Sequence, residues 1–337
     1  MTAKKTGVKK FGYFAWRSYV VAVGVSCLGL AGIAQAQESW PSKPIRLVVA
    51  GPAGGSADSL ARLLGEGLQQ KWNKPVIVEN KPGAAGVLAV NDLQANGKDG
   101  YTFLVIQGGV VSETPLAYKV HYKPFTDLKP LAQLSRIGLV LVANKDLPVS
   151  NLQQLISYAK SQPEGLNFAS YATGMRAHTA GMLLGQLTDM KLKHVGYKGS
   201  PPGLTDLMGG HVPLMFDGVA TSLPLIKAGK IKPIAVNYPT RIAELPNVPT
   251  FKEFGYPQLA QAGWFGLWSR PDVPPAIQQK MREATLDFLK LPAAQSRLKD
   301  LGMETGVAAS SEELMEDLKQ ASQQQAAVLK SINYQAE

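Results

Sequence analysis

Residues 45–70 read IRLVVAGPAGGSADSLARLLGEGLQQ, and this stretch contains the pattern on which the fold depends. The apolar residues at 45–49 predict a buried strand, and Gly54 and Gly55 allow the chain to turn tightly after it. The segment over residues 58–70 has helical periodicity, with apolar positions at Leu60, Leu63, Leu64 and Leu68. A strand, a glycine-rich loop and a helix in this order are typical of the repeating unit of an α/β protein.

The same alternation continues along the chain. Strands are predicted at residues 75–79, 101–106, 131–143, 167–170, 194–197, 213–216, 231–236 and 264–269. Helices are predicted at residues 87–94, 151–161, 179–187, 204–208, 223–228, 275–289, 292–301 and 311–331. We therefore expect an α/β fold with parallel-type sheets that are covered by helices.

The number of elements predicts two α/β lobes. No tether rich in proline and glycine separates the two blocks, which favours lobes joined by more than one crossing strand. The helices after Trp264 are expected to return to the first lobe. In the predicted division, lobe 1 comprises residues 37–135 and 260–337, and lobe 2, with the hinge crossings, comprises residues 136–259.

Residues 1–36 have the pattern of a signal peptide. Five basic residues and no acidic residue lie in this segment, an apolar run covers residues 19–33, and Ala34-Gln35-Ala36 gives a small-x-small cleavage site. We expect export through the general secretory route and a periplasmic protein. A retained N-terminal anchor is the alternative, and a lipoprotein is disfavoured because Gly24 stands three residues before Cys27.

Charge and composition exclude several classes of function. The chain has a formal net charge of +10, of which the leader contributes five, and the remaining excess is spread along the sequence. This does not predict a nucleic-acid partner. Cys27 is the only cysteine, and the histidines at 121, 178, 194 and 211 have no metal-ligand spacing. With neither a GxSxG nucleophile motif nor a P-loop, the sequence predicts no cofactor, no metal and no enzyme.

The loop at residues 50–58 is the first candidate for binding. It opens a helix, where backbone N–H groups have no intrahelical partner and the helix dipole adds partial positive charge. Gly54 and Gly55 let the backbone approach a ligand, and Ser56 adds a hydroxyl. Such a loop can hold a carboxylate without a lysine or an arginine. An ordinary strand–helix turn, in which Asp58 caps the helix, explains the same residues equally well.

The loop at residues 169–178 has the same form in the second block. Two such loops can direct two helix N-termini into one crevice at the carboxyl ends of the strands. Arg176 is the one fixed cation in either loop, and its guanidinium could pair bidentately with a second carboxylate. A solvated surface arginine is the alternative.

The chain resembles the Bordetella uptake gene (Bug) family, the solute receptors of tripartite tricarboxylate transporters. The motifs that carry the resemblance are WPSKPIRLVV (40–49), GGSAD (54–58), AR (61–62), VIVENKPGA (76–84), DGYT (99–102), GYKG (196–199), DLMGGHV (206–212), MFD (215–217), IKAGK (226–230) and LPNVPT (245–250). Each motif alone is weak, but together they are collinear with the family over nearly the whole mature chain.

The resemblance implies a type II-like periplasmic-binding-protein fold, with a ligand cleft between two lobes and no catalysis. It further implies a small organic acid as ligand, the membrane components of a tripartite transporter as partner, and a monomer. His178 is expected to support its loop structurally. The predicted ligand-binding residues are Gly51, Ala53, Gly54, Gly55, Ser56, Ala57, Asp58, Gln107, Thr173, Gly174, Met175, Arg176, Ala177, His178 and Asp217.

Two positions depart from the family pattern. Gly51 replaces a bulky aromatic residue, which should widen the crevice, and Arg176 replaces a small hydroxyl residue. A wider pocket with a second anion holder points to a longer or flatter diacid, such as the aromatic dicarboxylate terephthalate. Two alternative functions are a sensory receptor that presents the same ligand to a sensor kinase and an exported enzyme. The enzyme would need a nucleophile–base pair or a metal site, for which the sequence provides no residues.

Overall fold

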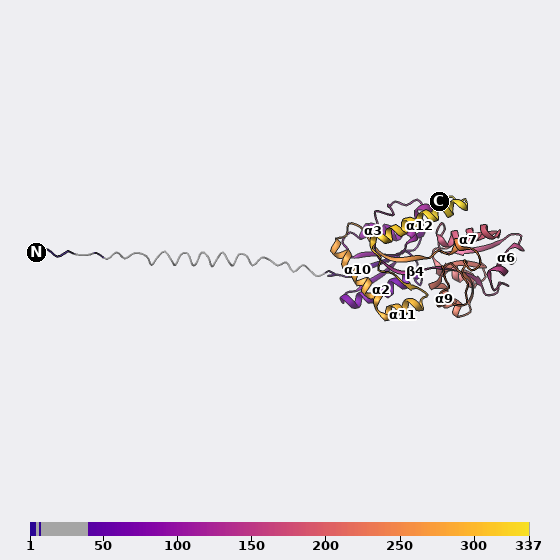
Figure 1. Ribbon diagram of the computed structural model, residues 1–337, viewed down its shortest axis with the longest axis horizontal. Coiled ribbons are helices and arrows are strands. Elements are labelled where there is room, and N and C mark those ends of the chain that lie inside the picture. The colour runs from indigo at the N-terminus through magenta and orange to yellow at the C-terminus, as the bar shows by residue number, and fades with distance from the viewer. Residues whose placement is uncertain (5–6, 8–39, 337) are drawn as a thin grey trace. The chain divides into compact units, whose positions relative to one another are not determined.

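The computed structural model describes residues 1–4, 7 and 40–336 (Figure 1). It divides into two units, residues 1–42 and residues 43–337, and the fold below is that of the second unit. Apart from residues 1–4 and 7, the predicted signal peptide lies outside the described residues. Within the described residues, none of the helices combines the length and the apolar character needed to cross a bilayer.

A six-stranded sheet, which we call the sheet of lobe 1, has the order β11-β4-β10-β3-β1-β2. Its strands are β1 (Ile45–Val49), β2 (Val76–Asn80), β3 (Thr102–Gln107), β4 (Lys129–Ile137), β10 (Gly263–Ser269) and β11 (Glu304–Thr305). β1 pairs in parallel with β2 and β3, whereas β10 runs antiparallel to both β3 and β4. The strands β1, β2, β3 and β4 therefore all end at the same edge of the sheet.

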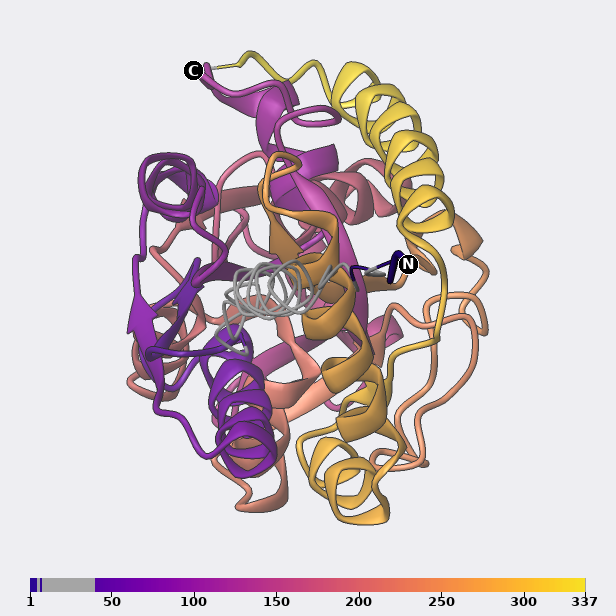
Figure 2. The ribbon, with the colours of Figure 1, turned by 90° about the vertical axis from the view of Figure 1, so that its left-hand side faces the viewer.

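Helices from both ends of the chain cover this sheet. They are α2 (Ser56–Trp72), α3 (Val87–Asn96), α10 (Pro275–Lys290), α11 (Pro292–Asp300) and α12 (Ser311–Ser331), with the short helices α4 (Gly109–Ser112) and α5 (Thr114–Ala117). α2 packs on β1 and β2 and also contacts α10. In Figure 2 the orange C-terminal helices and the purple N-terminal helices face the viewer on the same side of the molecule. α10 contacts α2 and β4, and α11 contacts β11, so the last helices pack on the sheet of lobe 1.

A five-stranded sheet, which we call the sheet of lobe 2, has the order β7-β6-β8-β5-β9. Its strands are β5 (Leu139–Asn144), β6 (Leu166–Ser170), β7 (Leu192–Gly196), β8 (Leu214–Gly218) and β9 (Ile231–Val236). Its helices are α6 (Leu152–Lys160), α7 (Arg176–Thr188), α8 (Ser200–Met208) and α9 (Val219–Lys227). Apolar clusters fill both faces of this sheet, one around Phe168, Phe216 and Phe251 and the other around Val140 and Met215.

The predicted strand over residues 131–143 is wrong, because it consists of two strands in different sheets. β4 ends at Ile137 in the first sheet, and β5 begins at Leu139 in the second. Gly138 separates them and lies directly against the ring of Tyr238, where a Cβ atom would be 2.1 Å from a ring carbon. The side chain of Asn237 also accepts a hydrogen bond from the Leu139 amide. A break that depends on a distant tyrosine leaves no signal in the local apolar run.

The passages between the lobes also change the expected sheet type. The chain enters lobe 2 at Gly138, and β5, the first strand after this point, pairs antiparallel with β8 and β9. The chain returns through residues 237–262, and β10, the first strand after this passage, pairs antiparallel with β3 and β4. Both sheets are therefore mixed rather than parallel throughout. The division into lobes at 135/136 and 259/260 stays a prediction.

The last helix reaches from one lobe to the other. α12 begins with a capping box in which Ser310 and Glu313 exchange side-chain and backbone hydrogen bonds. It then packs on β4 and α4 of lobe 1 and on α7 of lobe 2. Near its end, the buried Gln325 side chain donates to the carbonyl of Gly174 at 3.0 Å.

Candidate ligand-binding site

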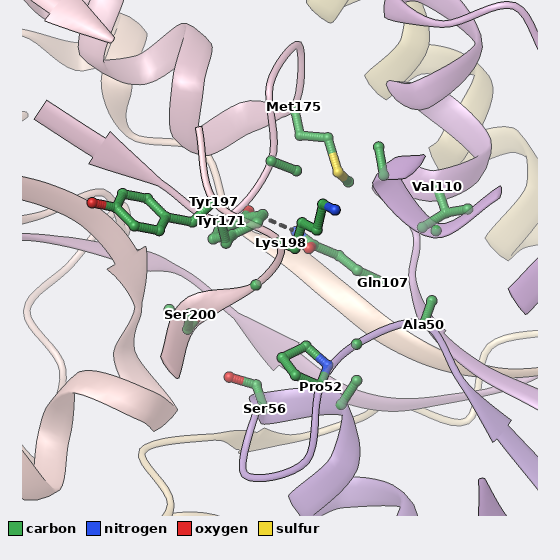
Figure 3. A pocket seen from close by; sticks show the side chains of 18 of the residues that line it. Ala50, Pro52, Ser56, Gln107, Val110, Tyr171, Met175, Tyr197, Lys198 and Ser200 are labelled. Carbon is green, nitrogen blue, oxygen red and sulfur yellow. Dashed lines mark hydrogen bonds between the residues drawn. The ribbon is translucent and has the colours of Figure 1, made fainter. Parts of the chain in front are cut away.

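A cavity of about 340 Å³ lies where the strands of both sheets end. This is the position in which open α/β sheets bind ligands. The lining residues from lobe 1 are Ala50, Gly51, Pro52, Gly55, Ser56, Ala57, Gly83, Ala84, Ala85, Gly86, Gln107, Val110, Tyr118, Ile137 and Phe265. Those from lobe 2 are Leu139, Tyr171, Ala172, Thr173, Met175, Gly196, Tyr197, Lys198, Gly199, Ser200 and Gly218. Figure 3 shows the polar groups among them surrounding an open space.

The start of α2 presents free backbone donors at this cavity. Gly55 precedes the helix in an extended conformation, and no side chain caps the helix at this residue. The N–H groups of Ser56, Ala57 and Asp58 have no hydrogen-bond acceptor within the described part of the chain. Two of these three residues, Ser56 and Ala57, line the cavity. An anion placed there would meet unpaired N–H groups, the Ser56 hydroxyl and the positive end of a helix dipole.

The side chain of Asp58 holds the loop and is not part of the cavity lining. Its carboxylate accepts hydrogen bonds from the Gly54 amide at 2.9 Å and from the Asn80 side chain at 3.1 Å, and it pairs with Arg62 at 2.9 Å. Burial opposes the charge, but these donors outweigh it and lower the pKa of Asp58. The carboxylate therefore stays ionised while it fixes Gly54 in its left-handed conformation, with φ of 76°.

Asn80, at the end of β2, is a positioning residue that the sequence did not identify. Besides its bond to Asp58, its side-chain amide donates to the carbonyl of Gly51 at 3.0 Å. It thereby holds both ends of the loop that carries the free donors. Asn80 is part of the VIVENKPGA motif, but the motif does not indicate which residues the asparagine contacts.

The helix that faces α2 from lobe 2 is α8 rather than α7. Gly199 precedes α8 with φ of 113°, no side chain caps the helix, and Gly199 and Ser200 both line the cavity. The next two residues are prolines, which have no N–H, so the Ser200 amide supplies the donor of the first turn. Lys198 stands immediately before this turn, and it is the one charged side chain among the described residues that line the cavity.

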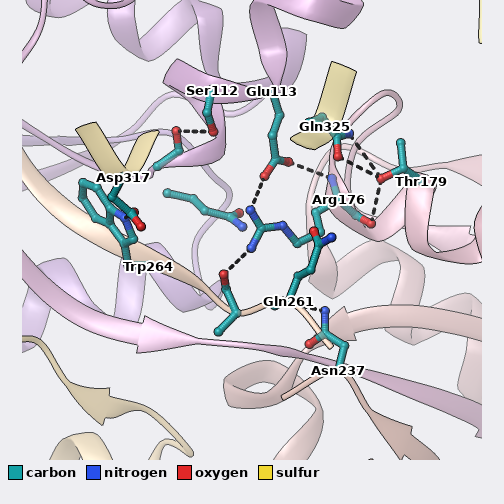
Figure 4. Close-up of polar contacts among 12 residues, drawn as sticks. Ser112, Glu113, Arg176, Thr179, Asn237, Gln261, Trp264, Asp317 and Gln325 are labelled. Atoms are coloured by element: carbon teal, nitrogen blue, oxygen red, sulfur yellow. Dashed lines mark hydrogen bonds and ion pairs between the residues drawn. The ribbon is translucent and has the colours of Figure 1, made fainter. Parts of the chain in front are cut away.

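The start of α7, which the sequence predicted to bind ligand, is occupied by a carboxylate of the protein itself. Glu113 of lobe 1 accepts a hydrogen bond from the Arg176 amide at 2.8 Å and pairs with the Arg176 guanidinium at 2.9 Å (Figure 4). The guanidinium also donates to the carbonyl of Ala262 on the returning passage, at 2.5 Å. Glu113 is fully buried and the Arg176 side chain is 12% exposed.

Both interpretations of Arg176 from the sequence therefore need correction. Its guanidinium is largely buried rather than solvated and pairs with Glu113, and Arg176 is not among the residues that line the main cavity. Instead, Arg176 borders a second cavity of about 330 Å³, which is also lined by Gln107, Trp264 and Asp317. The cause is a contact between residues far apart in the sequence, which the local pattern of residues 169–178 cannot reveal.

The predicted site residues divide into two groups. Those that line the main cavity are Gly51, Gly55, Ser56, Ala57, Gln107, Thr173 and Met175. Those outside its lining are Ala53, Gly54, Asp58, Gly174, Arg176, Ala177, His178 and Asp217. The side chain of Gln107 lies 3.5 Å from the Tyr171 hydroxyl, so it links the two lobes within the cavity.

Two of the residues outside the lining support nearby turns. Asp217 is fully buried and accepts hydrogen bonds from the hydroxyls of Thr221 and Ser222 at the start of α9, at 2.6 and 2.8 Å. Burial raises the pKa of Asp217, while the hydroxyls of Ser200, Thr221 and Ser222 act in the opposite direction. His178 accepts a hydrogen bond from the Gly174 amide at 3.0 Å, which is the structural role expected for it.

His178 also stacks on His194, and this pair predicts a dependence of stability on pH. The ring centroids are 3.9 Å apart, and His194 lies 2.7 Å from the Ser170 hydroxyl. Burial lowers the pKa of His178 to about 4, and burial together with the neighbouring imidazole lowers that of His194 to about 3. The unfolded chain takes up these protons near pH 6.5 while the folded protein does not, so stability falls as the pH decreases from about 6.5 to about 4.

We therefore expect the free energy of unfolding to be at least about 1 kcal/mol lower at pH 5 than at pH 7. Urea titrations at the two pH values measure this difference. In His194→Gln, which keeps a polar group near Ser170, the difference should be smaller. His211→Gln replaces an exposed histidine and serves as the control. An equal acid sensitivity in both variants would contradict the assignment to the buried pair.

The lobes meet around the cavity through glycines of lobe 2. A Cβ atom on Gly199 would lie 2.5 Å from Pro52, one on Gly174 would lie 2.1 Å from Ala117, and one on Gly218 would lie 3.3 Å from the Ser56 hydroxyl. Backbone of lobe 2 therefore rests directly on lobe 1 at these points. The structure is that of two lobes in contact around a partly enclosed cavity.

Proteins of known identity share this architecture. BugT of Bordetella pertussis is 33% identical over 264 residues, which cover 77% of this chain and 79% of BugT. The solved structure of the periplasmic binding protein BugD is 30% identical, with a TM-score of 0.83, and the match covers 88% of this chain and all of BugD. The structure of R. palustris Rpa4515 with adipate is also 30% identical, with a TM-score of 0.85, and covers 88% of this chain and all of that one.

These matches confirm the predicted periplasmic-binding-protein fold and the resemblance to the Bug proteins. The family profile described as "Tripartite tricarboxylate transporter family receptor" matches residues 60–334, which is most of the chain. The match begins within α2 and ends after α12, so it includes both lobes. The chain therefore belongs to the tripartite tricarboxylate transporter receptor family of solute-binding proteins.

Proposed function

We propose that this protein is a periplasmic receptor that captures a small di- or tricarboxylate and delivers it to the membrane components of a tripartite transporter. The observation that carries the proposal is the start of α2, where Ser56 and Ala57 offer unpaired N–H groups to a cavity with no acidic side chain among its described lining residues. Rpa4515, which resembles this chain, was solved with adipate, and a dicarboxylate is consistent with the same arrangement here.

The middle of the cavity supports a ligand with an apolar body. The aromatic residues Tyr118, Tyr171 and Phe265 contribute to its lining, and Gly51 borders it without filling it. A Cβ atom at Gly51 would have no neighbour within 4 Å. Such a space accepts a flat or long carbon skeleton between two charged ends. We therefore infer that the ligand is a diacid of the length of adipate or terephthalate.

Isothermal titration calorimetry of the mature protein tests this function directly. Terephthalate, phthalate, citrate, adipate and glutamate form a panel that varies the shape, length and number of the carboxylates. We expect binding of at least one diacid with an aromatic or a long aliphatic body. Tight binding confined to small amino acids would contradict the proposal. Loss of uptake of the bound acid in a deletion strain then separates transport from presentation of the same ligand to a sensor kinase.

Gly51→Phe tests the assignment of the apolar space. The glycine has an ordinary backbone conformation and open space beyond it, so a phenyl ring fits the fold but occupies the cavity. Calorimetry should show terephthalate binding at least about tenfold more weakly, while succinate binding changes less than about threefold. Ala53→Phe places the same ring on an exposed position of the same loop, outside the cavity lining, and should change neither. Equal losses for both acids in Gly51→Phe would count against this placement of the ligand body.

A further inference from the structure

Lys198 lines the cavity, but it has no role in binding the first carboxylate, which is proposed to bind at the start of α2. It belongs to lobe 2, in the turn between β7 and α8, and this turn rests on the loop of lobe 1 that binds the first carboxylate in the proposed function. A Cβ atom on Gly199, the next residue, would be only 2.5 Å from the Pro52 ring. Figure 3 shows the Lys198 side chain extending into the cavity toward the side of Gln107 and Met175, away from Ser56.

The charge of Lys198 is uncompensated. Its ammonium has neither an ion pair nor a hydrogen bond to any residue in the described part of the chain, although many other lysines pair with carboxylates, as Lys43 does with Asp99. Arg176, in the loop before α7, is neutralised by Glu113, and Lys81, in the loop after β2, pairs with Glu79. Lys198 is exposed, so water solvates its ammonium in the unliganded protein, and it provides the one full positive charge among the described residues that line the cavity. An anionic ligand that enters the cavity can therefore pair with it.

The two positive features of the cavity come from different lobes. The start of α2 belongs to lobe 1, whereas Lys198 belongs to lobe 2. A ligand with two carboxylates can contact both, but a ligand with one carboxylate can contact only one of them. A ligand shifts a conformational equilibrium only through its different affinity for the two states. A dianion gains its second ion pair only when the lobes come together, so it favours the closed state more than a monoanion does.

We propose that Lys198 determines specificity for dianions, because its ammonium holds the second carboxylate and couples that charge to closure of the lobes. This inference depends on the proposed function and adds the residue that selects the substrate class. It replaces the role that the sequence suggested for Arg176. The ligand is thus a dicarboxylate whose charged ends lie on opposite sides of an apolar body, one at Ser56 and one at Lys198.

The test compares each diacid with its own monoester. Calorimetry is carried out on the mature protein with adipate, monomethyl adipate, terephthalate and monomethyl terephthalate, so that only the second charge differs within a pair. The unmodified protein should prefer the better-bound diacid to its monoester by about tenfold or more, because the hydrogen bond between the second carboxylate and the ammonium is charge-assisted. In Lys198→Gln this preference should fall to less than about threefold, mainly through weaker binding of the diacid. Lys198→Arg should restore it.

Lys230→Gln serves as the matched control, since it removes an exposed lysine of the same lobe that does not line the cavity. Lys230→Gln should prefer the diacid to its monoester as strongly as the unmodified protein does. Small-angle X-ray scattering provides a second readout, in which the diacid decreases the radius of gyration of the unmodified protein but not that of Lys198→Gln.

The possible outcomes separate the two proposals. If the unmodified protein binds no carboxylate, the proposed function fails and this inference fails with it. If it binds carboxylates and Lys198→Gln retains the preference for the diacid, the inference about Lys198 is overturned while the proposed function stands. A loss of the same preference in Lys230→Gln would also overturn it, because the effect would then reflect net charge rather than position.

Discussion

Ser56→Asp is expected to weaken carboxylate binding by about 100-fold or more. Ser56 is the first residue of α2 and lines the cavity, so the new carboxylate would stand where the ligand's first carboxylate is proposed to bind. Two like charges within a few ångströms in a partly enclosed site repel each other by several kcal/mol, at about 1.4 kcal/mol per tenfold in affinity. An acidic residue in the first turn also stabilises a helix, so the variant should fold normally.

Ala53→Asp is the control for this variant. It adds the same charge to the same loop, on an exposed residue that does not line the cavity. Titration calorimetry with the diacid bound best by the unmodified protein should show less than about threefold loss for it, and circular dichroism should show both variants folded. A loss in Ala53→Asp as large as that in Ser56→Asp would mean that the general field of the loop, and not the start of α2, governs binding.

Glu113→Gln is expected to destabilise the protein by about 3 kcal/mol, which corresponds to a fall of about 6–12 °C in thermal midpoint. The substitution keeps the shape of the side chain and its acceptor for the Arg176 amide. However, it leaves the guanidinium of Arg176, which is 12% exposed, without the counter-charge that the structure provides. Removing one partner of a buried ion pair costs much more than removing both. Differential scanning calorimetry of the unliganded protein measures the change.

The double variant Glu113→Gln/Arg176→Met separates the charge effect from the loss of packing. It should be more stable than the sum of the two single variants predicts, because no unpaired charge remains in it. Glu66→Gln provides a surface comparison, since Glu66 and Arg297 are both 55% exposed and their pair should contribute less than about 1 kcal/mol. Strict additivity of the two single variants would refute the coupling between Glu113 and Arg176.

The parts of the fold that depend on local pattern were predictable. The strand, loop and helix at residues 45–70 appear as β1, the loop and α2, because apolar periodicity and glycine positions act over a few residues. The same holds for the helices at the C-terminal end and for the loop at Ser56, where the absence of a capping side chain is visible in the sequence itself. Recognition of the family came from motifs that are collinear along the chain.

What could not be predicted depends on contacts between distant parts of the chain. Arg176 was the obvious cation in its loop, but Glu113, from the other lobe, neutralises it. Lys198 was part of a recognised motif, yet its relation to the first loop depends on the packing of Gly199 against Pro52. The role of Asn80 likewise depends on its contacts with Asp58 and Gly51, which come from different elements. The sequence around each of these residues does not indicate such distant contacts.

The single-residue connection at Gly138 has a mechanical consequence. One residue spans at most about 3.6 Å, so the ends of β4 and β5 have almost no slack between them. Pressed against Tyr238, this connection has no spare length with which one half of the molecule could slide past the other. Any opening must therefore be a rotation about a nearly fixed point, in which small torsional changes near the pivot become wide displacements at the entrance.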